Sequence, residues 1–329
     1  MSRDAVYEAL SACPGKFVSG EALSEGLGIS RAAVWKAVEG LRKKGYQVEA
    51  KPGLGYRLDA ASDELLEREI RRYLSGPREH LICLETVDST NSYAKRIATE
   101  GAPGGTVVVA DCQRAGRGRM SRPFQSPAGQ GVYLTALWRP AVAPAGILPL
   151  TALGAVAVCN AVERACGVRP GIKWTNDLVM GNRKICGILT EMALEGESGL
   201  VQYVVMGIGV NVHQRAADFE GEVARLASSL DEQTGTFISR PRLAAAMTEE
   251  LDILYHEILP APRRWLEQYR KDCVTVGKPV QIVTGDKREE VFALDVDDQF
   301  GLVVRHRDGW EETVRSGEVS VRGLYGYLD

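Results

Sequence analysis

The feature of the sequence that most restricts the fold is an uncharged segment between Arg139 and Glu163. Its length raises the question of a membrane span, since about 20 apolar residues are enough to cross a bilayer. Two prolines, Pro144 and Pro149, interrupt the segment, and proline breaks a helix because it lacks the N–H donor. The Ala-rich remainder, which begins near Thr151, therefore predicts a buried helix in a globular domain, with no membrane partner.

Composition and charge agree with a globular chain. The 329 residues are 45% hydrophobic and 25% charged, which leaves room for more than one domain. A net charge of −3 means that any nucleic-acid surface must be local. Asp4 and Glu8 stand where a secretory signal would carry an apolar run, and the seven cysteines lack metal-site spacing, so we expect reduced thiols and a cytoplasmic protein.

Residues 1–61 have the pattern of a winged helix-turn-helix. Leu23 and Leu27 lie at helical spacing before a turn at Gly28, and Ser30 is expected to cap the second helix. The predicted apolar face of that helix consists of Ala33, Val34, Ala37, Val38 and Leu41. The stretch 51–55, between "YQVEA" and "YRL", predicts a hairpin with a glycine-rich tip.

The basic charge of the chain is concentrated on this unit. From Arg31 to Arg57 there are seven basic and two acidic residues, a local net charge of +5. This pattern favours a helix presented to a DNA major groove with a wing beside it. We expect DNA contacts from Ser30, Arg31, Lys36 and Lys51. A winged helix that serves only protein contacts is the open alternative.

Two further domains are predicted, which makes the whole chain an α+β multidomain protein. Residues 62–272 alternate apolar runs ("TVVVAD", "VYLTALW", "QYVVMGIGVNV") with helical patterns, as a mixed α/β sheet domain does. Residues 273–329 contain short strands separated by Gly-Asp, Asp-Asp and Asp-Gly turns, which indicates a small SH3-like β-barrel.

A cationic loop, "QRAGRGRMSRPFQSP", occupies residues 113–127. Its arginines are Arg114, Arg117, Arg119 and Arg122. Arginine offers planar, permanently charged donors for phosphate or carboxylate, while Gly116 and Gly118 allow close approach of a backbone to a ligand. The loop has hardly any apolar residue to anchor it, so we expect it to close over an anionic ligand. A merely solvated charged loop is the alternative.

Three other motifs carry polar side chains next to predicted strands. "VDSTNSYA" places Ser89, Thr90 and Asn91 before a helix, where they serve either a small polar ligand or the helix cap. "IKWTNDLVMGNRKICGILTE" contains Lys173, Asn176, Asp177 and Lys184; lysine charges neutralise a phosphate or carboxylate, and an aspartate positions Mg²⁺ or an attacking amine. "GIGVNV" adds Gly207, Gly209 and Asn211 without the spacing of a dinucleotide fingerprint.

In order along the chain, "DSTN", "GRGRMSR", "KWTNDL", "KICGILTE" and "GIGVN" resemble the catalytic signature of biotin protein ligases. With the amino-terminal winged helix, the chain is similar to the bifunctional members of that family, which also repress the biotin operon. The resemblance covers essentially all 329 residues.

The resemblance implies the activity of a biotin–[acetyl-CoA-carboxylase] ligase. Such enzymes join biotin to ATP, with Mg²⁺, to form biotinyl-5′-AMP and pyrophosphate, and then pass the biotinyl group to a lysine of a biotin carboxyl carrier domain. Two anions meet in the first step, so positive charge is needed. The resemblance further implies a disordered loop that folds over the adenylate and excludes water, operator DNA as a partner, and a homodimer promoted by biotinyl-AMP through edge strands.

The family's site residues carry over position by position. The catalytic positions match Lys184, Arg119 and Asp177. The biotin contacts match Ser89, Thr90, Asn91, Gln113, Gly116, Arg117, Arg119 and Lys184. The nucleotide contacts match Arg119, Arg122, Lys173, Asn176, Asp177, Gly207, Asn211 and Phe219. No residue is assigned as the ligand of a resident metal ion. Glu318 and Arg322 match the signature of the carboxy-terminal domain, although a surface pair on a β-barrel is an equal alternative.

The chain departs from the family in the cationic loop. Where the family reads Arg-Gly-Arg-x-Trp, residues 120–124 are Met-Ser-Arg-Pro-Phe. Phe124 can still pack as an aromatic, and Pro123 is expected to stiffen the loop.

Two other functions stay open. A lipoate-type ligase is disfavoured by the loop and the winged helix, and a biotin-sensing regulator with little ligase activity has the same residues.

Overall fold

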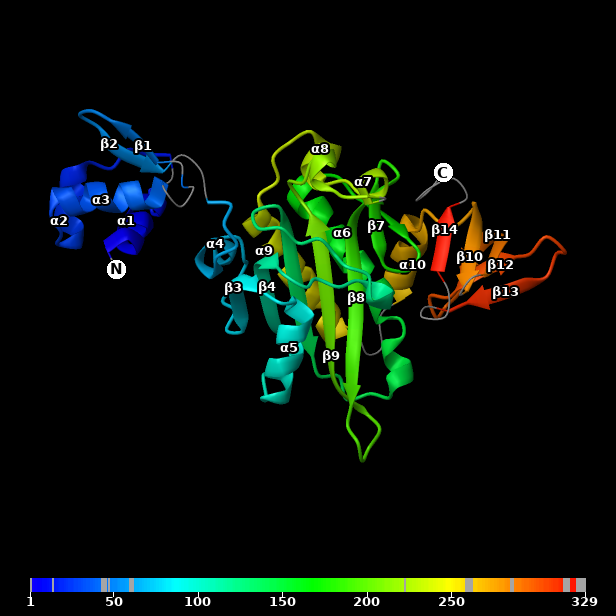
Figure 1. Ribbon diagram of the computed structural model, residues 1–329. Coiled ribbons are helices and arrows are strands. Elements are labelled where there is room, and N and C mark those ends of the chain that lie inside the picture. The colour runs from blue at the N-terminus through cyan, green and yellow to red at the C-terminus, as the bar shows by residue number, and fades with distance from the viewer. Residues whose placement is uncertain are drawn as a thin grey trace. The chain divides into compact units, whose positions relative to one another are not determined.

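The computed structural model describes residues 2–13, 15–42, 46, 48–58, 62–221, 223–257, 263–284, 287–315 and 320–323. These residues form two compact units, Met1–Asp63 and Glu64–Asp329 (Figure 1). The predicted third domain, 273–329, falls within the second unit, where Val280, Ile282 and Val291 join the same hydrophobic core as the central sheet. The boundary at 272/273 stays a prediction.

The first unit is a helix-turn-helix with a hairpin, as the sequence predicts. Its elements are α1 (Ser2–Ser11), α2 (Gly20–Leu27), α3 (Arg31–Arg42), β1 (Val48–Lys51) and β2 (Gly55–Leu58). Gly28 ends α2 in the left-handed conformation, with φ of 63°, and Ser30 accepts a hydrogen bond from the Ala33 amide at 3.2 Å. The buried face of α3 is formed by Val34, Ala37, Val38 and Leu41.

The second unit is built on a mixed seven-stranded sheet in the order β3-β4-β5-β9-β8-β7-β6. Its strands are β3 (Leu81–Val87), β4 (Thr106–Gln113), β5 (Gly131–Trp138), β6 (Gly171–Lys173), β7 (Asp177–Met180), β8 (Arg183–Leu194) and β9 (Val201–Asn211). Only the β3–β4 pair is parallel, because α5 (Thr90–Thr99) returns the chain between them. The three strands predicted from the quoted apolar runs are confirmed.

Helices cover both faces of this sheet. On one face, α6 (Leu150–Cys166) and α9 (Arg240–Glu257) pack over Val107, Val109 and Leu134. On the other face, α5 covers the sheet (Figure 1). It packs over Val108, which points away from its neighbours because successive strand residues alternate between faces. The remaining helices are α4 (Glu67–Arg71), α7 (Val223–Leu226), α8 (Leu230–Thr234) and α10 (Arg263–Asp272), and the short 3-10 turns are η1 (Arg119–Ser121), η2 (Pro144–Ile147) and η3 (Ala216–Asp218).

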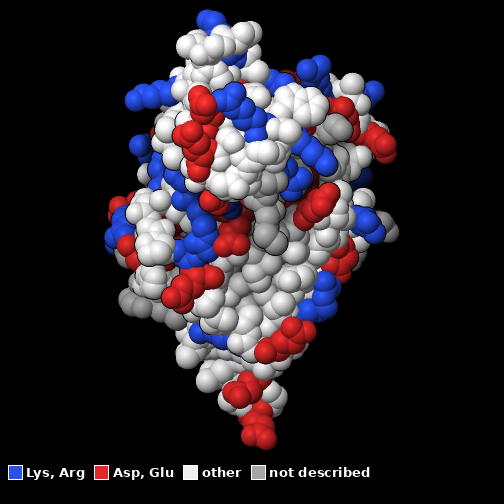
Figure 2. Space-filling model, turned by 90° about the vertical axis from the view of Figure 1, so that its left-hand side faces the viewer, with Lys and Arg blue, Asp and Glu red and all other residues white. Residues whose placement is uncertain are grey.

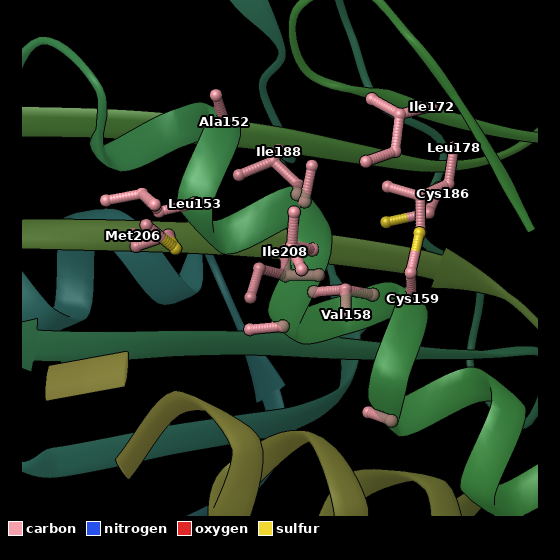
Figure 3. Packing of buried hydrophobic residues seen from close by; sticks show 14 of the residues in the cluster. Ala152, Leu153, Val158, Cys159, Ile172, Leu178, Cys186, Ile188, Met206 and Ile208 are labelled. Carbon is pink, nitrogen blue, oxygen red and sulfur yellow. The ribbon is translucent and has the colours of Figure 1, made fainter. Parts of the chain in front are cut away.

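The apolar segment that raises the membrane question is a core helix. Pro144–Cys166 is long and apolar enough to cross a membrane by length and composition, but 67% of its most apolar window is buried inside the protein. Figure 3 shows Leu153 and Val158 of α6 meeting Met206 and Ile208 of β9. The approach is close, since a Cβ on Gly154 would lie 2.5 Å from the Met206 sulfur.

The carboxy-terminal region forms a five-stranded antiparallel sheet in the order β13-β12-β11-β10-β14. Its strands are β10 (Pro279–Thr284), β11 (Lys287–Val296), β12 (Leu302–Arg305), β13 (Glu311–Val314) and β14 (Ser320–Gly323). The predicted Asp-Asp and Asp-Gly turns separate β11 from β12 and β12 from β13, whereas the Gly-Asp pair, 285–286, lies outside the described residues. Closure of this sheet into a barrel stays a prediction.

Truncation of a buried leucine tests the packing of the central sheet. Leu134 on β5 is fully buried, so Leu134→Ala is expected to lower the free energy of unfolding of the second unit by about 3 kcal/mol. The matched control is Leu148→Ala, because Leu148 is 66% exposed. Urea unfolding measures both variants. Equal losses in the two variants would contradict the core assignment.

Candidate active site

A cavity of about 810 Å³ lies where the cationic loop meets strands β7, β8 and β9. It gathers most of the residues that the sequence singles out. Those that line it are Ser89, Thr90, Asn91, Gln113, Arg117, Arg119, Arg122, Lys173, Asn176, Asp177, Lys184, Gly207, Gly209, Asn211 and Phe219. Gly116 and Arg114 are not among the lining residues. Segments separated by more than 100 residues in sequence thus contribute to one concave surface.

The lining is strongly cationic. Its basic residues are Arg117, Arg119, Arg122, Lys173, Arg183, Lys184 and Arg225. Asp177 supplies the carboxylate among the described lining residues. By contrast, basic and acidic side chains are interspersed on the face shown in Figure 2, in keeping with the small net charge of the chain. The excess of positive charge is therefore local, and it fits a ligand with several negative charges.

The cationic loop folds back on itself as a short ladder. The Phe124 amide donates to the Gly116 carbonyl at 2.9 Å, and the Gly118 amide donates to the Arg122 carbonyl at 2.8 Å. Met120 lies at the turn with φ of 54° and is 60% exposed. Gly116 serves this ladder, because a Cβ there would lie 2.5 Å from the Phe124 carbonyl oxygen.

Phe124 gives the loop an apolar anchor. An ideal Cβ on Gly209 would lie 2.4 Å from Cε1 of the ring, and one on Gly187 would lie 3.4 Å from Cε2. These two glycines face each other across the β8–β9 pair, so they leave a bare patch of sheet under the aromatic ring. The loop, which has hardly any apolar residue to anchor it, is thus anchored at Phe124, the aromatic that the sequence allowed to pack.

Gly207 makes room for Asn91 in the same way. An ideal Cβ on Gly207 would lie 2.2 Å from Oδ1 of Asn91, a residue in the first turn of α5. The amide of Asn91 accepts from the Thr135 hydroxyl at 2.7 Å and donates to Glu191 at 2.9 Å and to the Leu189 carbonyl at 3.2 Å. Asn91 thus forms a fixed part of the wall, and its contact with biotin stays a prediction.

Glu191 is held ionised beside this amide. Burial raises the pKa of its carboxyl, but hydrogen bonds from Lys95 and Asn91 more than offset that effect, so the net pKa is lowered. The Lys95 ammonium lies 2.8 Å from the carboxylate. An acceptor that stays charged at neutral pH keeps the Asn91 amide in one orientation.

The start of α5 is tied to the start of the loop. The amide and hydroxyl of Thr90 donate to Oε1 of Gln113 at 2.9 and 3.0 Å, and Nε2 of Gln113 donates to Ser126 at 2.8 Å. Ser89 is the N-cap of α5, with its oxygen facing the Ser92 amide. The capping interpretation of Ser89 is therefore confirmed, while its side chain also lines the cavity.

A chain of polar contacts crosses the nucleotide side of the predicted site. Nη1 of Arg119 donates to Oδ1 of Asn176 at 3.0 Å, and Nδ2 of Asn176 donates to Asp177 at 3.2 Å. The Lys184 ammonium lies 2.6 Å from the same carboxylate. The loop, β7 and β8 are thus joined by one network, and the three positions expected to be catalytic share it.

Trp174 is a lining residue that the sequence interpretation missed. Its indole Nε1 donates to the Phe300 carbonyl at 2.9 Å, and its amide donates to the Thr275 hydroxyl at 2.9 Å. Trp174 and its neighbour Lys173, which is 6% exposed, both belong to the cavity lining. The two hydrogen bonds of Trp174 therefore connect the cavity wall to the carboxy-terminal region. The motif contains this tryptophan, but no local pattern reveals partners 101 and 126 residues away.

Residues of 219–221 and 223–228 form a further part of the cavity wall. The Ser228 amide donates to the Lys184 carbonyl at 2.9 Å, and Asn211 donates to the Ser228 carbonyl at 3.0 Å. Phe219 is 8% exposed within the lining. Arg183 and Arg225, which the sequence interpretation missed, also line the cavity.

The carboxy-terminal signature is only partly visible. Glu318 lies outside the described residues. The backbone of Arg322 pairs with Gln281 of β10, and its side chain lies outside what the structure describes. Its expected reach toward the ATP site therefore stays a prediction.

The first unit presents a separate candidate surface on α3. Lys36 and Lys51 are exposed, and Arg31 is exposed in an ion pair with Glu21. Arg42 instead donates to the Val48 carbonyl at 2.7 and 3.0 Å, which fixes the wing against α3. Trp35, 59% exposed, also lies on this helix.

A double-mutant cycle tests whether Gly207 serves Asn91. Gly207→Ala is expected to destabilise the protein by about 2 kcal/mol, because the new methyl group overlaps the amide. In an Asn91→Ser background the overlap is removed, so the same substitution is expected to cost much less, with a coupling energy above about 1 kcal/mol. Urea unfolding of the four proteins measures the coupling. Additive losses would show that Gly207 does not serve Asn91.

Comparison with known proteins agrees with this geometry. Residues 83–211 match the biotin/lipoate A/B protein ligase family, and residues 3–57 match a helix-turn-helix domain. The chain is 38% identical over 314 residues to the bifunctional ligase/repressor BirA of Bacillus subtilis, covering 93% of this chain and 95% of the relative. It is 33% identical to BirA of Escherichia coli, covering 94% of each chain.

A solved structure shows the same fold. Biotin protein ligase from Aquifex aeolicus in complex with biotin and ATP has a TM-score of 0.62 and 25% identity, covering 74% of this chain and 99% of that one. The extent of the match with the bifunctional relatives, over both the helix-turn-helix and the ligase regions, decides the assignment. The chain belongs to the biotin/lipoate A/B protein ligase family, in the form that carries an amino-terminal helix-turn-helix.

Proposed function

We propose that this protein is a biotin protein ligase and a biotin-responsive transcriptional repressor. Its ligase half makes biotinyl-5′-AMP from biotin and ATP and transfers biotin to a lysine of a biotin carboxyl carrier domain. The observation that carries this proposal is a cavity with seven lining cations and one described lining carboxylate, bounded by a loop that has a packed aromatic anchor. Such a lining suits a reaction in which two anions must meet.

The first step joins the biotin carboxylate to the α-phosphorus of ATP. A carboxylate oxygen forms the new P–O bond while the bond to the leaving pyrophosphate breaks. The two reactants repel each other, so preorganised cations lower the barrier. Lys184, whose ammonium is held 2.6 Å from Asp177, is the proposed bridge between the reacting groups, and Arg117, Arg119 and Arg122 are proposed to hold the phosphate and carboxylate oxygens.

The two substrates are assigned to different walls. We place biotin against the start of α5 and the loop, where Ser89, Thr90 and Gln113 offer polar groups and Phe124 offers an apolar face. We place the nucleotide between Asn176, Asp177 and the lining residues of 223–227, with Phe219 packing on adenine. Lys173 and Asn211 support that wall.

The second step transfers the biotinyl group. The amine of the carrier lysine attacks the carbonyl carbon of the mixed anhydride, an amide bond forms, and AMP leaves. The attacking amine must be neutral and oriented, and Asp177 is the described lining carboxylate that can accept its hydrogen bond. The loop covers the anhydride and excludes water, which would otherwise hydrolyse it.

The donor set of the cavity fits Mg²⁺ that arrives with ATP. In nucleotide sites this ion takes one or two protein carboxylates together with substrate phosphates, and Asp177 is the carboxylate in position to complete that set. When bound, the ion neutralises phosphate charge. The residues of this chain then orient the substrates around it.

The repressor half rests on the first unit. Lys36 and Lys51 are exposed, Arg31 faces solvent beside Glu21, and Ser30 begins the helix that would enter the major groove. We propose an inverted-repeat operator of the biotin genes, bound by a homodimer that biotinyl-AMP promotes. β3 is an edge strand of the central sheet and is the proposed place where two copies pair.

We further propose cytoplasmic location and an SH3-like closure of the carboxy-terminal sheet.

Incubation of the purified protein with biotin, ATP, Mg²⁺ and a carrier domain tests the ligase function. A mass gain of one biotinyl group on the carrier is expected. Lipoate in place of biotin is the control for a lipoate-type ligase. DNA binding without any transfer of biotin would instead support a regulator that lacks ligase activity.

Lys184→Ala is expected to lower the rate of adenylate formation about a hundredfold, because it removes the cation proposed to lie between the reacting anions. Release of pyrophosphate measures the rate. Lys287→Ala, at an exposed lysine of the carboxy-terminal sheet, is the control. Near wild-type release by the Lys184 variant would remove this residue from the mechanism.

Lys36→Ala is expected to weaken operator binding and to reduce the slope of log K against log salt by about one, as the loss of one phosphate contact does. Binding to the region upstream of the biotin genes is measured by fluorescence anisotropy over a salt series with biotinyl-AMP present. Lys287→Ala is again the control. An unchanged slope would exclude Lys36 as a phosphate contact.

A further inference from the structure

The cationic loop returns to the sheet through a stem that cannot hold itself in place. Residues 126–131, "SPAGQG", contain two glycines and no large apolar side chain. A backbone of this kind gains little from burial, so its position must come from polar partners. The structure supplies those partners from outside the loop.

Asp111, two residues before the loop, holds the stem at Gly129. Both carboxylate oxygens accept from the Gly129 amide at 3.2 Å. Arg240, the first residue of α9, pairs with the same carboxylate and donates to the Gly131 carbonyl at 3.3 Å. One guanidinium thus connects the strand that enters the loop with the strand that leaves it.

A tyrosine completes this arrangement. The Tyr133 hydroxyl donates to the Pro127 carbonyl at 3.1 Å, and burial raises the pKa of the phenol, so it remains a donor at neutral pH. Gly131 leaves space for the ring, since a Cβ there would lie 2.7 Å from the hydroxyl oxygen. The stem is therefore held at Pro127, Gly129 and Gly131.

The stem leads directly to residues that face the cavity. Ser126 donates to the Phe124 carbonyl at 3.0 Å and accepts from Gln113. Phe124 in turn lies over the bare sheet at Gly209. A displacement of the stem therefore moves the aromatic anchor of the loop, although neither Asp111 nor Arg240 lines the cavity.

We propose that the Asp111–Arg240 pair is a positioning device for the cationic loop, and that it sets how long the adenylate is retained. Arg240 is 5% exposed and Asp111 is 24% exposed, so the interaction is little screened by solvent. Both are positioning residues, because they act through the stem. The proposal rests on the ligase function for its ligand.

The main test removes both charges. An Asp111→Asn/Arg240→Met double variant removes both charges of this pair, and replacing a buried pair in this way often preserves stability. We expect a melting temperature near that of the wild type and dissociation of biotinyl-AMP at least about tenfold faster, with the KM for biotin raised more than kcat is lowered. Asp111→Asn alone is expected to change the dissociation rate in the same direction.

A closely matched ion pair provides the control. Arg78 pairs with Asp252 near the other end of α9 and donates to the Gly105 carbonyl, so it joins a carboxylate and a glycine carbonyl as Arg240 does. Neither residue lines the cavity. An Arg78→Met/Asp252→Asn variant is expected to retain biotinyl-AMP as the wild type does.

A ligand-free measurement separates this proposal from the ligase function. Trypsin cleavage within the loop, after Arg117 or Arg119, is expected to be faster in the Asp111/Arg240 variant than in the wild type or the control. If the wild-type protein makes no adenylate, the ligase function is contradicted. Faster cleavage in the Asp111/Arg240 variant would still support the positioning role. The positioning role would be overturned if neither the cleavage rate nor the dissociation rate of biotinyl-AMP changed in this variant. It would also be overturned if both rates changed equally in the Arg78/Asp252 control.

Discussion

The absence of side chains at two alternate positions of β9 is the constraint on which the rest of the site depends. Gly207 and Gly209 point to the same face of the sheet, and each leaves a space that a protein side chain from elsewhere fills. Asn91 enters one space and Phe124 the other. Helix α5 and the cationic loop can therefore approach the sheet closely enough to form the walls of one cavity.

Parts of the fold with local signals could be predicted from the sequence. The cap at Ser30, the left-handed turn at Gly28 and the alternation of Val107 to Val109 all follow from neighbouring residues. The motifs also contain most of the lining residues, because most motifs lie near the end of a strand or the start of a helix, while "KICGILTE" runs along β8. Local patterns were sufficient wherever a short segment determines its own conformation.

Contacts between distant segments could not be predicted in this way. The glycines of "GIGVNV" line the cavity, but nothing near them in the sequence indicates that Asn91 and Phe124 fill the space above them. Nothing near Asp111 in the sequence indicates a partner 129 residues later, and the same holds for the Trp174 indole and Phe300. These contacts depend on how helices and sheets are layered, which single-segment periodicity does not encode.

The position of Trp174 has a practical consequence for spectroscopy. Trp174 is a lining residue of the cavity and its indole donates to the Phe300 carbonyl, so its environment depends both on the site and on the packing of the carboxy-terminal region. Trp35 and Trp310 are largely exposed, while Trp138 and Trp265 are buried away from the cavity lining. A protein in which the other four tryptophans are replaced by phenylalanine would therefore carry a native fluorophore whose emission reports occupancy of the cavity without any attached label.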